Sequence, residues 1–346
     1  MLRAFSLATT WLAFVVFALS VPAAIAEGTH PVGLRQVEYV EPKDHRTMWM
    51  AVFYPAVVDA VVVKPFPVAL ATNLHVYEDA EIADTGRRHP LIMLSHGRGS
   101  SAWEYVWLAE TLAAHGYIVA ALNHYQANRY DSEIAYLANK IWQRPIDVSL
   151  DITFLLNDPL WGKLIDPQRI GVAGHSQGGF TALWVGGARI NPERFLAFQR
   201  RFIDNRQIPE HIRKALPLDA APALDVRDRR VRAVFAMAPG LMQVFGMDAD
   251  GLRQLTVPTY LVTGARDRQV PPDENAAFAA KYIPNAKLWV IPGPVDHEIF
   301  TNECTDEGRD ELPEGCVDDP GVDRGKLHQE IGAAALKFFA DSLGAL

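Results

Sequence analysis

The chain has 346 residues, of which 49% are hydrophobic and 21% charged, and its formal net charge is −8. This composition supplies a core of ordinary size and excludes an intrinsically disordered chain. The acidic balance, without a long basic run, argues against nucleic acid or an anionic membrane surface as the main partner.

The N-terminus has the pattern of a secretory signal. Arg3 precedes an apolar run over residues 4–18, and the small-residue triplet Ala24-Ile25-Ala26 follows. We predict that residues 1–26 are cleaved at this A-x-A site rather than kept as a membrane anchor. The mature chain, residues 27–346, is then periplasmic or secreted, and no later segment is long and apolar enough to span a bilayer.

Short apolar runs alternate with helical patterns along the mature chain. We predict strands at 34–39, 47–54, 90–95, 117–122, 169–173, 231–236, 259–263 and 287–291, and helices at 104–115, 146–156, from 180 onward, and at 325–343. Residues 57–89 are predicted to be irregular, because prolines and an acidic patch interrupt them. Strands that alternate with helices predict an α/β fold with a mostly parallel central sheet and helices on both faces.

Residues 191–230 break this alternation. They are rich in arginine and proline and contain an amphipathic stretch at 195–203. We interpret them as a helical cap insertion over the carboxyl edge of the sheet, within one catalytic domain.

The run Gly174-His175-Ser176-Gln177-Gly178 matches the nucleophile-elbow pattern G-x-S-x-G. Such a turn holds its serine in a strained conformation, and only very small residues fit two positions before and after it. The pattern is short, but here it follows an apolar strand and precedes a helix. We therefore predict that Ser176 is a nucleophile, against the alternative of an ordinary glycine-rich turn.

A serine nucleophile needs a base and an acid that orients the base. Asp267 follows a predicted strand at the sheet edge and is the predicted acid, with Asp273 as its nearest competitor. His297 lies in the loop after the last strand and is the predicted base. The adjacent Asp296 is an alternative acid but is interpreted as a loop-shaping residue, and His328 as a surface or packing residue.

Backbone donors must stabilise the negative charge that develops on the substrate oxygen. The predicted donors are the N–H groups of Gln177, next to the nucleophile, and of Arg98, in the loop after the strand at 90–95. His96 and His175 are predicted to have structural roles.

The chain has only two cysteines, Cys304 and Cys316, in one polar loop. Export would expose them to an oxidising compartment, so we predict a disulfide rather than two free thiols. No His or Cys cluster accompanies the pair, so no metal site is predicted.

These motifs resemble the α/β-hydrolase superfamily, and in particular the predicted dienelactone-hydrolase group related to platelet-activating-factor acetylhydrolases. The resemblance is carried by His96-Gly97-x-Gly99, by Gly174 to Gly179, by Asp267 and His297, and by the tail that runs from Cys304 through Asp318-Asp319-Pro320-Gly321 to the closing helix. True dienelactone hydrolases use a cysteine at the elbow, so the resemblance does not carry dienelactone over as substrate.

The resemblance implies hydrolysis of small-molecule, lipid or polymer esters through an acyl-enzyme, without a cofactor. Two alternatives remain: an amidase or peptidase on the same scaffold, and a catalytically inactive binding protein. Trp103, Trp107 and Trp184 near the predicted site are compatible with a lipid-surface role, although core or pocket-wall positions are the preferred interpretation.

Overall fold

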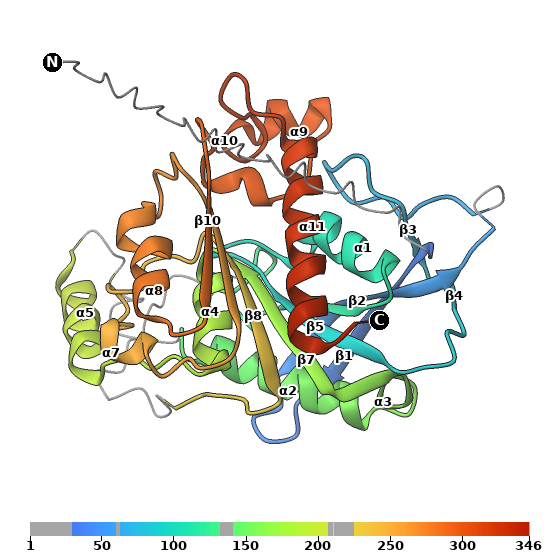
Figure 1. Cartoon of the computed structure of the whole chain (residues 1–346), viewed down its shortest axis with the longest axis horizontal. Helices are drawn as coiled ribbons and strands as arrows, with labels where there is room; N and C mark the ends of the chain where they lie inside the picture. Colours follow the sequence, from blue (N-terminus) through green and yellow to red (C-terminus); the bar gives the residue numbers. More distant parts are fainter. Residues whose placement is uncertain (1–29, 60–62, 132–140, 207–209, 211–224, 346) are drawn as a thin grey trace, which may run out of the picture.

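The computed structural model describes residues 30–59, 63–131, 141–206, 210 and 225–345. Within them, one mixed sheet of ten strands runs through the centre of the molecule (Figure 1), in the order β10-β9-β8-β7-β5-β6-β2-β1-β3, with β4 paired to β2. The strands are β1 (Val32–Val40), β2 (Thr47–Val57), β3 (Val76–Glu78), β4 (Glu81–Ile82), β5 (His89–Ser95), β6 (Ile118–Asn123), β7 (Ile165–His175), β8 (Val231–Met237), β9 (Thr259–Gly264) and β10 (Ala286–Ile291).

Helices follow most of the strands of the parallel part. The α-helices are α1 (Val106–Ala114), α2 (Gln143–Asn157), α3 (Trp161–Leu164), α4 (Gln177–Gly186), α5 (Pro192–Asp204), α7 (Ala249–Leu252), α8 (Ala276–Tyr282), α9 (Asp306–Glu311), α10 (Pro313–Cys316) and α11 (Arg324–Leu343), and the 3₁₀ helices include η1 (Ala102–Tyr105), η3 (Pro272–Glu274) and η4 (His297–Phe300).

The sheet is parallel from β6 to β10 and antiparallel at β2. Strands β5 to β10 pair in parallel with one another. Strand β2, in contrast, pairs antiparallel with β1, β4 and β6. This arrangement confirms the predicted mostly parallel sheet. The carboxyl ends of β5, β7, β9 and β10 consequently lie along one edge, where the loops that carry the predicted site begin.

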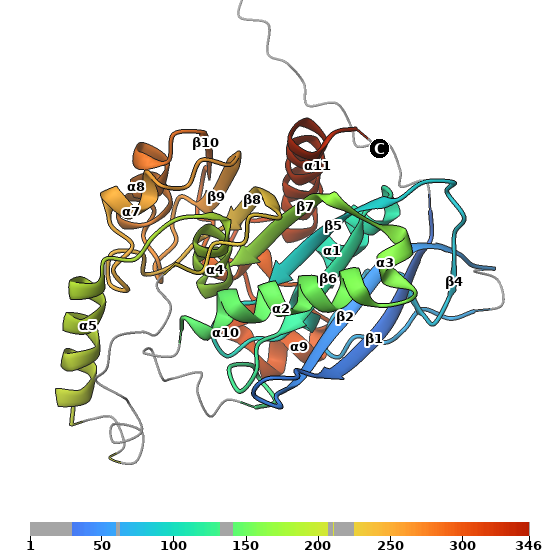
Figure 2. The ribbon, with the colours of Figure 1, turned by 90° about the horizontal axis from the view of Figure 1, so that it is seen from below.

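Two hydrophobic layers cover the two faces of the sheet. Side chains alternate along β2, so Met50 and Val52 pack with α2 and α4, whereas Ala51 and Phe53 pack with α1 and α11. Figure 2 shows α2 and α11 on opposite sides of the strands. Helices on both faces, as predicted, explain why β5 is buried along its whole length.

The predicted elements differ from the structure mainly in short segments. Residues 57–89 contain β3 and β4, and β3 exists only because it pairs in parallel with β1, a long-range contact that leaves no periodic pattern in three residues. Helix α4 begins at Gln177 rather than at residue 180, since the nucleophile turn leads directly into its first turn. The short helices α3 and α7 to α10 were not predicted.

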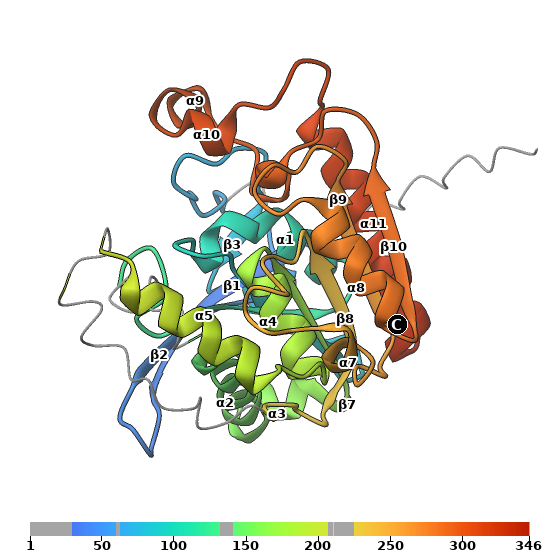
Figure 3. The same ribbon diagram turned by 90° about the vertical axis from the view of Figure 1, so that its left-hand side faces the viewer.

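The predicted cap at 191–230 is described only in part. Its first half forms α5, which buries Phe195 and packs Phe198 edge-on against Phe245. Figures 1 and 3 place α5 apart from α9 and α10. Residues 207–209 and 211–224 lie outside the described residues, so the cap stays a prediction.

The predicted signal at 1–26 also lies outside the described residues. Among the helices of the described part, none has the length and apolar character needed to cross a membrane.

Candidate active site

Ser176 occupies the turn between β7 and α4 in a strained backbone conformation. Its φ is 55° and its ψ −119°, in a region that L-residues rarely adopt. Backbone bonds hold the turn, because Ser176 N donates to Met237 O at 2.9 Å and Gly240 N donates to Ser176 O at 3.1 Å. The turn therefore presents the serine side chain at the carboxyl edge of the sheet.

The elbow glycines are required by close backbone approach. A β-carbon at Gly178 would clash with the carbonyl oxygen of Ser95, and one at Gly174 with the carbonyl oxygen of Gly178. Only glycine permits β5, β7 and α4 to come this close.

His297 and Asp267 come from different loops and meet beside the elbow. His297 begins η4, after β10, and its Nδ1 lies 2.7 Å from Asp267 Oδ2. The other carboxylate oxygen of Asp267 accepts backbone N–H groups from Gln269 at 3.1 Å and Val270 at 2.8 Å. Both side chains are buried, so the carboxylate fixes the orientation of the imidazole.

The competing carboxylates take other positions. Asp296 accepts the backbone N–H of His297 at 2.8 Å and pairs with Arg268, and these contacts hold its pKa below the usual range. It shapes the loop, as predicted from the sequence, and its carboxylate binds the backbone of His297. Asp273 is exposed in η3, and His328 packs flat on Trp107 with ring centroids 3.9 Å apart.

The loop after β5 is held in one conformation by His96. The Nδ1 atom of His96 lies 2.7 Å from Gly97 O, and its Nε2 atom accepts the N–H of His124 at 3.2 Å. Because a carbonyl only accepts, Nδ1 carries the proton. Burial keeps the pKa of His96 well below its usual value, which agrees with a neutral ring.

This bond determines where the next amide points. In a trans peptide the carbonyl of Gly97 and the N–H of Arg98 point in opposite directions. With Gly97 O turned toward the His96 ring, the Arg98 N–H is turned away from that ring. Arg98 and Gln177 both line the pocket that contains Ser176 and His297.

A second chain of hydrogen bonds joins this loop to the histidine loop. Tyr105 Oη accepts the Gly97 N–H at 3.1 Å and lies 3.0 Å from His175 Nδ1, while His175 Nε2 lies 3.1 Å from His297 O. The carbonyl of His297 fixes the proton on Nε2, so Nδ1 accepts from Tyr105. His175 thus has the structural role that the sequence predicted, whereas Tyr105 was not identified from the sequence.

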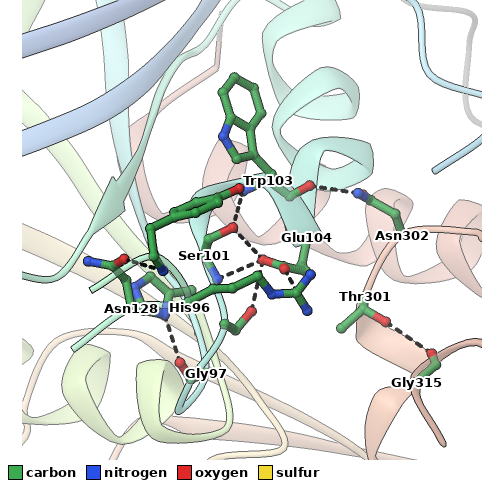
Figure 4. Close-up of polar contacts among 12 residues, drawn as sticks. His96, Gly97, Ser101, Trp103, Glu104, Asn128, Thr301, Asn302 and Gly315 are labelled. Carbon is green, nitrogen blue, oxygen red and sulfur yellow. Dashed lines mark hydrogen bonds and ion pairs between the residues drawn. The ribbon is translucent and has the colours of Figure 1, made fainter. Parts of the chain in front are cut away.

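The 3₁₀ helix η1 and its N-cap Ser101 tie the same loops together (Figure 4). Glu104 accepts the Ser101 N–H at 2.6 Å and the Ser101 hydroxyl at 2.7 Å. Asn302 Nδ2 donates to Trp103 O at 2.7 Å, and Thr301 Oγ1 lies 3.5 Å from Gly315 O. The Asn302 contact brings the segment after η4 against η1, which follows the loop after β5.

The pocket measures about 740 Å³ and has two walls from distant parts of the chain. Residues 66–71 form one wall together with Trp103, and residues 312–316 belong to the other. The two walls meet at an isolated bridge between Ala71 and Cys304, reinforced by Thr305 N donating to Leu70 O at 2.9 Å. Both walls include apolar side chains, so the pocket can take the non-polar parts of a ligand.

Cys304 and Cys316 form a disulfide, as predicted, and both line the pocket. Of the three tryptophans named from the sequence, Trp103 lines the pocket, while Trp107 and Trp184 are buried. Among the described residues, no three His, Cys, Asp or Glu side chains gather as metal ligands would.

The strand order, together with a strained serine between a parallel strand and a helix, defines an α/β-hydrolase-type protein. Residues 91–306 match the model of the alpha/beta hydrolase family. This match covers more than half of the chain, and the chain therefore belongs to that family.

Two relatives agree with this assignment. A platelet-activating factor acetylhydrolase from the dog, Canis lupus familiaris, is 31% identical over a match that covers 29% of this chain and 32% of that protein. The chain thus spans about a third of the length of this curated relative. A ferulic acid esterase from Streptomyces cinnamoneus superposes with a TM-score of 0.61 at 21% identity, covering 92% of each chain, and this likeness shows the fold.

Proposed function

We propose that the chain is a carboxylic-ester hydrolase in which Ser176 is the nucleophile, His297 the base and Asp267 the acid that orients it. The observation that carries this proposal is the 2.7 Å contact from His297 Nδ1 to Asp267 Oδ2, in a pocket that also contains the strained Ser176. An acid that grips Nδ1 leaves Nε2 for the serine proton.

The first half-reaction makes an acyl-enzyme. Ser176 Oγ attacks the ester carbonyl carbon while His297 Nε2 takes the hydroxyl proton, and the backbone N–H groups of Arg98 and Gln177 stabilise the oxyanion. The intermediate collapses as the carbon–oxygen bond to the alcohol breaks, and His297 returns its proton to the leaving alcohol.

The second half-reaction releases the acid. Water attacks the acyl carbon, His297 takes one proton from that water, and the serine oxygen leaves with the proton from His297. The products are a carboxylic acid and an alcohol, and the residues named need no cofactor for either step.

The relatives support an ester as the substrate. One is named for the hydrolysis of an acetyl group and the other as an esterase of ferulic acid. Short-chain, lipid-like and aromatic esters all suit the mixed polar and apolar pocket.

Replacing Ser176 by Ala tests the nucleophile. We expect hydrolysis of p-nitrophenyl acetate and butyrate to fall on the order of 10⁴-fold or more, because no other group can form the acyl-enzyme. Turnover by the Ser176→Ala variant equal to that of the wild type, with an unchanged circular dichroism spectrum, would refute the proposal.

Two further readouts separate the alternatives. An inactive binding protein would stay unlabelled by a fluorophosphonate probe, whereas we expect labelling of the wild type and none of Ser176→Ala. An amidase or peptidase would cleave peptide p-nitroanilides in a Ser176-dependent manner, whereas we expect no measurable p-nitroanilide cleavage by this chain.

A further inference from the structure

Arg144 is a buried arginine at the start of α2 that contacts both sides of the proposed oxyanion hole. Its side chain is almost fully enclosed, with the residue 2% exposed. One terminal nitrogen donates to His96 O, the other to Gln177 Oε1 at 3.3 Å, and Nε donates to Thr181 Oγ1 at 3.3 Å. The single guanidinium therefore bridges the loop after β5 and the first turn of α4.

On the loop side, Arg144 fixes a whole peptide plane. The peptide between His96 and Gly97 is held at its carbonyl by Arg144 and at its N–H by Tyr105 Oη. The next peptide carries the Arg98 N–H, and its plane is set by the His96 ring. The two planes share the Gly97 Cα, and glycine leaves the angle between them unrestrained. Loss of the Arg144 contact would therefore let the first plane shift and displace the Cα atom from which the second plane starts.

On the helix side, Arg144 acts on the other donor. Thr181 Oγ1 donates to Gln177 O at 2.8 Å and accepts from Arg144 Nε. Arg144 thereby restrains both the side chain of Gln177 and, through Thr181, its backbone. Gln177 carries the second N–H of the proposed oxyanion hole.

The chemistry of these contacts argues for more than stability. All three acceptors that the structure shows for Arg144 are neutral, and removing a guanidinium from water in such surroundings is costly. This burial lowers the pKa of Arg144, while Asp147 nearby partly opposes the effect. A methionine of similar volume would fill the space without that cost, so packing alone does not account for a guanidinium at this position.

We propose that Arg144 is a positioning residue for the oxyanion hole, holding the Arg98 and Gln177 amides at the separation that the tetrahedral intermediate requires. The inference rests on the ester-hydrolase function proposed above. The planar set of donors on the Arg144 guanidinium matters for this role. A lysine ammonium at this position keeps the charge but cannot donate to all three acceptors at once.

The test compares Arg144→Lys and Arg144→Met with the wild type on p-nitrophenyl butyrate. We expect kcat to fall about 10²-fold in both variants, as for the loss of one oxyanion donor, with KM changed less than about 3-fold. Phenylboronic acid forms a tetrahedral anion on a serine, so its affinity should fall in parallel with kcat.

Arg169 offers the matched control, because its guanidinium also donates to neutral carbonyls, those of Leu343 at 2.8 Å and Ala345 at 3.0 Å. It lies on β7 toward the end away from Ser176. Arg169→Met should lower the thermal midpoint yet keep kcat and boronate affinity at wild-type values. If the Arg144 variants show the same kcat and the same boronate affinity as Arg169→Met, the inference is overturned.

If the Arg144 variants do not fold, Thr181→Val tests the inference instead. This substitution removes one of the three acceptors of Arg144 and nearly preserves the side-chain volume. A fall of about 5-fold in kcat and in boronate affinity supports the inference, whereas wild-type values overturn it. Ser176-dependent activity of the wild type is measured first. Its absence refutes the proposed function itself, and its presence with unaffected variants refutes only the role of Arg144.

Discussion

Two neighbouring carboxylates at the proposed active site have different geometric relations to the same histidine. Asp267 contacts the imidazole, and its remaining oxygen is saturated by two backbone N–H groups. Asp296 is adjacent to His297 in sequence but binds its backbone N–H and the exposed Arg268. Proximity along the chain therefore does not decide which carboxylate contacts the imidazole of His297.

Asp267→Asn and Asp296→Asn separate these roles. We expect Asp267→Asn to lower kcat on the order of 10³–10⁴-fold, because the amide favours the wrong tautomer of His297. Asp296→Asn keeps an acceptor for the His297 N–H and loses only an exposed ion pair. We therefore expect kcat to fall less than about 5-fold in this variant. Steady-state kinetics on one ester would measure both, and the reverse order would contradict the assignment of the acid.

At the scale of elements, the disulfide holds a wall of the pocket rather than the proposed nucleophile, acid and base. It closes the segment that contains α9 and α10, and the two cysteines are separated by 12 positions in the sequence. This segment meets residues 70 and 71 through the bridge between Ala71 and Cys304 and through Thr305 N, which donates to Leu70 O at 2.9 Å. Removing the cross-link loosens the wall, whereas Ser176 and Asp267 are held by other elements.

The double variant Cys304→Ser, Cys316→Ser tests this division. We expect KM to rise several-fold with kcat little changed, and the free energy of unfolding to fall by about 3 kcal/mol from the lost loop constraint. Dithiothreitol should reproduce the rise in KM in the wild type and have no effect on the double variant. A KM that is the same in all four measurements would show that the wall does not contact the substrate.

At the scale of the whole molecule, buried neutral histidines make the fold sensitive to acid. Burial lowers the pKa of His328 to about 3 and keeps the pKa values of His96, His124 and His175 well below their usual value. The unfolded chain binds a proton at each of them near pH 6.5, whereas the folded chain does not. Their contribution is fully present above about pH 6.5 and is lost as the pH falls toward 3.

His328→Phe measures one of these contributions. The phenyl ring keeps the stacking on Trp107 but cannot titrate, so relative to the wild type the variant should gain up to about 1.4 kcal/mol per pH unit below pH 6.5. Asp147, whose pKa burial raises to about 6, acts in the opposite direction in both proteins and cancels in the difference. Urea unfolding at pH 7.5 and 5.0 gives the values, and a difference that is independent of pH would contradict the prediction.

The loss of the contact from His328 Nε2 to Ile299 O, 2.8 Å long in the wild type, lowers the stability of this variant at both pH values. Only the change between the two pH values tests the titration.

The sequence by itself determined the α/β class and the long strands, and it predicted Ser176, Asp267 and His297 as the nucleophile, acid and base. These follow from local rules: apolar runs buried on both faces, a turn that only glycine permits, and loops that must leave the carboxyl ends of parallel strands. The disulfide was also accessible from the sequence, because the chain has only two cysteines.

Only the tertiary structure decided which residues support the site. Arg144 precedes Pro145 in an otherwise ordinary helix start, and Tyr105 lies among core residues of η1, so neither carries a local signal. Their roles arise from contacts across 48 and 70 residues. The same applies to the pocket walls, where residues 70–72 pair with residues 303–305. Pairing over such distances depends on the whole fold rather than on any short pattern.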